Sequence, residues 1–170
     1  MNDPTLRPRV KPEYGAMDRW LDAAGVGLLL LLWAVTIWLY FHLPETIPVH
    51  FNLHGEADRF GDKSSLFLQA SIATGVFLLI TLLMRVPHLF NYPVPVTEAN
   101  AEKMYTNAVR MLRVVRIAEV LIFFPELAGM YGRVQDPNRN IRLLWIPETL
   151  LAVALVAYFV RGVWGKSARR

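Results

Sequence analysis

Two long apolar runs dominate the first half of the chain. Residues 23–43 (AAGVGLLLLLWAVTIWLYFHL) and residues 64–84 (SSLFLQASIATGVFLLITLLM) contain no Asp, Glu, Lys or Arg. With a rise of about 1.5 Å per residue, a helix of either run can cross a hydrocarbon core about 30 Å thick. The first run is longer than the apolar part of a cleavable signal peptide, which has about 7–15 residues. The pattern predicts two transmembrane helices, the first of them an uncleaved anchor.

The second half holds two further apolar runs, at residues 114–132 and 143–160. A core helix of a soluble protein would carry polar residues on one face at every turn, and neither run does. We therefore expect an all-α fold, a multi-pass membrane helical bundle with about four transmembrane helices. The expected organisation is a flexible cytoplasmic arm at 1–22, a four-span membrane domain at 23–160 with an outer loop at 44–63, and a basic cytoplasmic tail at 161–170.

A cytoplasmic connection at 85–113 separates the second and third predicted spans. Thr97 is the expected N-cap of a helix that leads into the third span. Its apolar positions recur at helical spacing, and its basic residues fall toward another side: Lys103, Arg110 and Arg113. This pattern is typical of an amphipathic helix on the membrane surface whose basic side chains reach lipid headgroups. The same face is alternatively a docking surface for a cytoplasmic partner.

Charge placement sets the expected orientation. The 170 residues are 54% hydrophobic and 19% charged, with a net charge of +4 and no cysteine. With the N-terminus inside, thirteen of the 18 Lys and Arg residues lie on the cytoplasmic side. This bias predicts a protein of the bacterial cytoplasmic (inner) membrane with both termini cytoplasmic. Attraction to anionic lipid accounts for the basic character, so the lipid bilayer is an expected partner and nucleic acid is not.

The outer loop carries the candidate chemistry. His50 and His54 are four residues apart, with Glu56 and Asp58 close by, so these four are candidate ligands for a divalent metal such as zinc. Prolines and glycines argue against a helix here, which weakens the spacing argument. A second interpretation is a loop that His50 closes by a hydrogen bond, in which Gly55 makes a turn and Asp58 or Asp62 caps the next helix. A third is a pH-sensing histidine pair.

Three acidic residues fall inside predicted spans, where a carboxylate costs about 2.5–3.5 kcal/mol at the bilayer centre. Arg116 and Glu119 are three apart and are expected to pair. Glu126 and Glu148 each follow a proline, and the two carboxyls are expected to share a polar pocket below the outer loop. That pocket is a candidate proton, cation or ligand site. The alternative is hydrogen bonding to backbone groups that the prolines leave without partners.

The outer loop also resembles a known family. Its signature is Leu43-Pro44, then Ile47-Pro48-x-His50-Phe51-Asn52, then Gly55-Glu56-x-Asp58, then Lys63. This order of residues, directly after an N-terminal span, is similar to the SdpI-like (DUF1648) family of bacterial integral membrane proteins and covers about the first half of the chain. For characterised relatives the resemblance implies toxin immunity, with signalling through a sequestered repressor.

These observations predict a non-enzymatic binding or immunity/signalling-type factor, with no cofactor beyond the possible metal. The expected recognition residues are His50, Asn52, Gly55, Glu56, Asp58, Glu126 and Glu148. The expected partner is a peptide toxin, another membrane protein or a second copy of the chain. A small membrane metalloenzyme or ion-coupled transporter is an alternative, although no His-Glu-x-x-His motif is present. An accessory subunit of a larger membrane complex is another.

Overall fold

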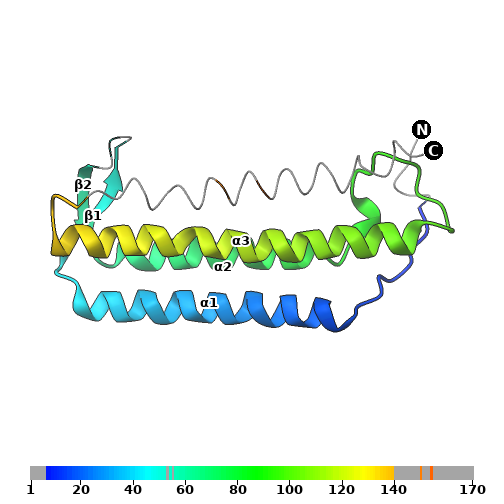
Figure 1. Ribbon diagram of the computed structural model, residues 1–170, viewed down its shortest axis with the longest axis horizontal. Coiled ribbons are helices and arrows are strands. Elements are labelled where there is room, and N and C mark those ends of the chain that lie inside the picture. Colours follow the sequence, from blue (N-terminus) through cyan, green and yellow to red (C-terminus); the bar gives the residue numbers. More distant parts are fainter. Residues whose placement is uncertain (1–6, 53, 55, 140–149, 151–153, 155–170) are drawn as a thin grey trace.

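The structure is a computed structural model that describes residues 7–52, 54, 56–139, 150 and 154. Three long helices run side by side: α1 (Ala16–His42), α2 (Ser65–Leu83) and α3 (Ala101–Gln135). Figure 1 shows that α1 and α3 run in the same direction and α2 in the opposite one. A hairpin of β1 (Thr46–Phe51) and β2 (Ala57–Asp62) lies at one end, and the connection that contains η2 (Pro87–Leu89) lies at the other.

Two of these helices, α1 and α2, are long and apolar enough to cross a membrane. Only 22% and 28% of their most apolar windows are buried within the protein, whereas the core helix of a soluble protein is mostly buried. Many large apolar side chains instead point outward: Val26, Leu30, Leu31, Ile37, Trp38, Phe41, Leu68, Ile72, Leu78, Leu79, Leu82 and Leu83. The predicted spans at 23–43 and 64–84 are therefore confirmed as helices of spanning length. The predicted fourth span at 143–160 lies outside the described residues, apart from Leu150 and Ala154.

The third predicted span is part of a longer helix. One continuous α3 of 35 residues covers both the expected surface helix and the 114–132 run, with Pro125 inside it. It begins at Ala101, after Asn100, rather than at Thr97, because Thr97 and Asn100 form a turn in which the Asn100 side chain accepts the Thr97 N–H at 2.8 Å. α3 packs against both α1 and α2 and carries buried residues along its whole length.

The core lies between the three helices and extends under the hairpin. Leu32 and Leu39 of α1, Phe77 of α2 and Leu127 of α3 are almost completely buried in it. Ile47 of β1 joins the same cluster, so the hairpin is fixed to the helices through its first strand. The expectation of an all-α fold is thus corrected by a small antiparallel sheet, which forms because alternate β1 positions, Ile47 and Val49, face inward toward the helices.

The N-terminal arm is held in place from Arg7 onward. The Arg7 guanidinium donates hydrogen bonds to the carbonyls of His88, at 3.2 Å, and Phe90. Tyr105 at the start of α3 donates its hydroxyl to the Pro8 carbonyl at 3.0 Å. α1 itself begins at Ala16. From Arg7 onward, the expected flexible arm at 1–22 makes ordered contacts, because its arginine donates to backbone carbonyls next to η2. The same segment also contains the first turns of α1.

Candidate functional site

The hairpin gathers most of the residues that the sequence singled out. Its strands pair antiparallel, with Thr46 opposite Asp62 and Ile47 opposite Gly61, and its register shifts on either side of His50. Such bulges end regular pairing and redirect side chains. Every residue of β2 from Asp58 to Phe60 is exposed, and Phe60 keeps 62% of its surface open. One face of the hairpin is therefore buried against the helices while its tip and second strand point outward.

Asn52 closes the hairpin. Its side-chain oxygen accepts the backbone N–H groups of His54 at 2.8 Å and Glu56 at 3.0 Å, and its amide donates to the Glu56 carboxylate at 3.0 Å. Its backbone N–H also donates to the Glu56 carbonyl at 2.9 Å. This is the loop-closing interpretation, with Asn52 rather than a histidine as the central residue. Asn is suited to this position because its side chain bonds to backbone groups two residues further on. Gly55 lies outside the described residues.

His50 and Asp58 form the second polar pair. His50 Nδ1 lies 2.5 Å from Asp58 Oδ1, and the two side chains keep 52% and 44% of their surface exposed. The pair joins β1 to β2 on the outward side. The four candidate metal ligands are not brought together as one set, since within the described part of the chain no three His, Cys, Asp or Glu side chains lie close enough to hold a metal ion.

Lys63 and Asp62 form polar contacts at the base of the hairpin. Lys63 donates to Glu45 at 2.9 Å and lies 4.9 Å from the centre of the Tyr40 ring. The Glu45 hydrogen bond raises the pKa of Lys63. Asp62 accepts the Ser64 N–H at 2.7 Å, and hydrogen bonds from Ser64 lower the pKa of Asp62. Asp62 therefore stabilises the start of α2, as the sequence suggested for Asp58 or Asp62.

Glu126 lies on α3, on the side that packs against α2. Its carboxylate accepts a hydrogen bond from Gln69 of α2 at 3.2 Å. Among the described residues, the hydrogen bond of Glu126 goes to Gln69 and not to the hairpin. Glu148 lies outside those residues, so the shared Glu126 and Glu148 pocket stays a prediction. The partner of Glu126 in the described bundle is an amide rather than a second carboxyl.

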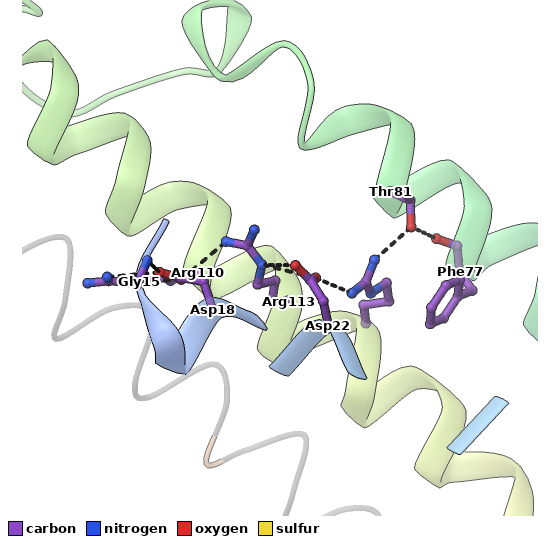
Figure 2. A network of polar contacts seen from close by, with 8 residues as sticks. Gly15, Asp18, Asp22, Phe77, Thr81, Arg110 and Arg113 are labelled. Carbon is purple, nitrogen blue, oxygen red and sulfur yellow. Dashed lines mark hydrogen bonds and ion pairs between the residues drawn. The ribbon is translucent and has the colours of Figure 1, made fainter. Parts of the chain in front are cut away.

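A ladder of five charged residues, which the sequence analysis did not anticipate, joins the helices at the end away from the hairpin. Along it Arg110, Asp18, Arg113, Asp22 and Arg116 alternate in sign (Figure 2). Arg110 donates twice to Asp18, at 2.9 and 3.0 Å. Arg113 contacts Asp18 at 3.2 Å and Asp22 at 3.0 Å. The ladder thus connects the first turns of α1 to α3.

Arg116 carries the ladder to the third helix. It donates to Asp22 at 2.6 Å and to the Thr81 hydroxyl of α2 at 2.9 Å, and its guanidinium lies 4.4 Å from the centre of the Phe77 ring. The expected pair between Arg116 and Glu119 is wrong, because Asp22 and Thr81 occupy both terminal nitrogens of Arg116. The interpretation of Arg110 and Arg113 as lipid-facing is corrected in the same way, because both donate to acids of α1.

The spacing that builds this ladder is visible in the sequence. Asp18 and Asp22 are four apart, and the three arginines of α3 follow at intervals of three, so each set lies on one helical face. The signal is a complementary pair of charge stripes in two helices that neighbour each other. It could have located the ladder only if α1 and α3 had been known to pack in parallel.

Comparisons with known proteins place the hairpin inside a recurring segment. Residues 27–74 match the family model described as a domain of unknown function, DUF1648. An uncharacterized protein of Archaeoglobus fulgidus is 40% identical over 73 residues, which covers 38% of this chain and 40% of the relative. The chain therefore matches about two fifths of that relative's length. No solved structure matches the chain. The predicted resemblance to DUF1648 is confirmed over residues 27–74, which contain most of α1, the whole hairpin and the first half of α2.

Proposed function

We propose that the chain is an integral protein of a bacterial cytoplasmic membrane, with the hairpin on the outer side. The exposed apolar surface of α1 and α2 supports this placement, because soluble proteins rarely expose so large a contiguous apolar area. The distribution of basic residues supports the orientation. Several basic residues lie at the end opposite the hairpin, which is the side that the positive-inside rule assigns to the cytoplasm. Arg19 lies near the start of α1, Arg85 just after α2 and Lys103 at the start of α3, and Arg7 contacts His88 of η2.

We further propose that the protein is a non-enzymatic recognition factor whose binding element is the hairpin. The observation that carries this proposal is that some hairpin residues hold its structure while others are exposed to solvent. Ile47 anchors it in the core, Asn52 fixes its turn, and His50, Asp58 and Phe60 remain outward. A rigid element that presents polar groups and one aromatic ring to solvent is suited to binding another molecule with little ordering cost.

The class of ligand follows from position and from the family resemblance. In this orientation the hairpin lies on the extracytoplasmic face of the cytoplasmic membrane. Peptides that act on the cell envelope would reach it there. A role in immunity to such a peptide, as in the SdpI-like family, is therefore the specific form of the proposal. Phe60 offers an apolar contact, and the polar pair of His50 and Asp58 offers orientation.

A complementation experiment tests this function. Cells that lack the gene are challenged with a panel of envelope-active peptides, and resistance is restored with the full-length gene or its variants. We expect N52A and the H50A/D58A double variant to lower resistance, because each removes hydrogen bonds that hold the outward surface in place. N91A is the matched control, since Asn91 is exposed at the other end of the bundle.

Equal amounts of each variant in the membrane fraction, measured by immunoblot, are required for the comparison. Full resistance with N52A and H50A/D58A at equal amounts would reject the hairpin as the recognition element. Metal analysis of the purified protein separates the metalloprotein alternative. Stoichiometric zinc that is lost in both H50A and H54A would replace the proposed role with a metal-dependent one.

A further inference from the structure

Buried polar atoms without partners gather along the seam between α2 and α3. In the described part of this seam, five buried side-chain atoms have no hydrogen-bond partner: Ser65 Oγ, Gln69 Oε1, Arg116 Nε and both carboxyl oxygens of Glu119. Buried polar groups in proteins are hydrogen-bonded in the great majority of cases, so a cluster of exceptions calls for an explanation. Glu119 is the most demanding of them because an ionised carboxylate is the costliest group to bury.

The antiparallel packing of α2 and α3 fixes where Glu119 lies. Arg116 contacts Thr81 toward the ladder, and Glu126 contacts Gln69 toward the hairpin. Glu119 lies between these two levels on α3, one turn from Arg116 and two turns from Glu126. It therefore occupies the middle of a polar seam whose two ends are hydrogen-bonded and whose centre is not.

Among the residues that the structure describes, no free cation compensates an ionised carboxylate at Glu119. Arg116 is the cation one turn away, but its two terminal nitrogens are committed to Thr81 and to Asp22 of α1. The polar residues of α2 along the seam, Thr81 and Gln69, do not ionise. Glu126 is itself an acid and supplies no positive charge to the seam. The arrangement therefore favours the neutral acid.

We propose that Glu119 is a proton-binding site, a carboxylic acid held neutral in the seam and able to release its proton when Arg116 Nε turns toward it. On release the Glu119 O–H bond breaks, the proton passes to a water molecule in the seam, and the electron pair stays on the carboxylate. The carboxylate then accepts a hydrogen bond from the Arg116 Nε–H. Water is suited to the seam because several polar atoms there lack partners.

Infrared spectroscopy of the full-length protein in lipid vesicles tests the protonation state. At neutral pH we expect a carbonyl band of a protonated carboxyl that shifts in D2O and loses one carboxyl's worth of intensity in E119Q. E119D should retain the band. E102Q is the matched control, because Glu102 is exposed in the first turn of the same helix. An unchanged band in E119Q would overturn the proposal, and so would a wild-type protein without such a band.

A second measurement tests the part assigned to Arg116. In the D22N/R116Q double variant, which removes one charge of each sign, the Glu119 band should persist to higher pH than in the wild type. The reason is that the donor which stabilises the ionised carboxylate is gone. Loss of the band at the same pH in both proteins would reject the role of Arg116. Thermal unfolding verifies that E119Q is folded. If E119Q does not fold, the presence or absence of the acid band in the wild type and in E119D decides the question.

The proposed proton site depends on the membrane placement in one respect, the low dielectric that the membrane provides around the bundle. It does not depend on the proposed role of the hairpin. Extraction of membranes with alkaline carbonate tests the placement separately. A protein that stays in the membrane and lacks the acid band contradicts the proton site alone. Release by carbonate contradicts the membrane role, whatever the infrared spectrum shows.

Discussion

Asp18 Oδ1 on α1 lies 3.2 Å from Arg113 Nη1 on α3, and the two side chains keep only 0% and 4% of their surface exposed. Removing one member of such a buried pair leaves the other charge without compensation, which typically costs more than the pair itself contributes. The relationship makes the ladder a structural element rather than a surface ion pair.

We expect D18N to destabilise the protein by about 3 kcal/mol, the usual cost of breaking a buried ion pair from one side. The midpoint of thermal unfolding in detergent, followed by circular dichroism, measures this loss. D18N/R113Q should recover part of it because both charges are then absent. E98Q, an exposed carboxylate near the start of α3, serves as the control. If D18N unfolds at the same midpoint as the wild type, the structural role of Asp18 is contradicted.

Gly61 allows β2 to pass close to Val49. A Cβ atom added at Gly61 would lie 3.2 Å from the nearest Val49 methyl carbon, so G61A should destabilise the hairpin by about 1–3 kcal/mol through overpacking. Hydrogen exchange of the amides in β1 and β2 measures the effect, and V49A should relieve it in the double variant.

Gly27 supplies the comparison for that substitution. A Cβ atom there meets nothing within 4 Å, so G27A should leave the hairpin exchange rates unchanged. Since alanine favours a helix interior by about 1 kcal/mol over glycine, G27A should not lower the unfolding midpoint. Equal behaviour of G27A and G61A would show that Val49 does not restrict the position.

The Asp62 cap predicts a pH dependence at the start of α2. Hydrogen bonds from Ser64 hold the pKa of Asp62 below its ordinary value of 3.8. The carboxylate therefore contributes stability above that ordinary value, and the contribution is lost as the pH falls through the lower, folded-state pKa. The NMR shift of the Ser64 amide should follow this step. D62N should abolish it, while E98Q should leave it intact.

Arg7 should control the order of the segment around η2. Its hydrogen bonds to the carbonyls of His88 and Phe90 connect the arm to that segment. We expect R7A to raise hydrogen exchange at residues 88–92 several-fold and to expose them to proteases. R9A is the matched control, because Arg9 is exposed. Equal protection in R7A and R9A would show that other contacts hold the segment.

Local patterns in the sequence predicted the long helices well. The 23–43 and 64–84 runs lie within or almost within α1 and α2, because uninterrupted apolar residues of spanning length leave a helix as the structure that satisfies every backbone group. α1 begins at Ala16, before the predicted run at 23–43. Asp18 and Asp22 interrupt the apolar pattern there, and their partners lie more than 90 residues further along the chain.

The sequence pattern predicts that several polar residues of the hairpin lie near one another, but it does not predict how they pair. His50, Asn52, Glu56 and Asp58 do gather at one end, yet the hairpin that arranges them depends on β1 packing against the helices. The Arg116 and Glu119 pair failed for a related reason. The spacing along α3 allows Arg116 to contact Glu119. In the structure the Arg116 guanidinium instead donates to Asp22 of α1 and Thr81 of α2.

The ladder also has a consequence in time. Arg110 follows Asp18 by 92 residues, so at a synthesis rate of roughly 5–20 residues per second the acids of α1 wait roughly 5–20 seconds for their partners to be made. During that interval neither acid has its arginine partner. Closure of the ladder is then a late step of folding, because the arginines that join α1 to α3 are made only after the whole of α2.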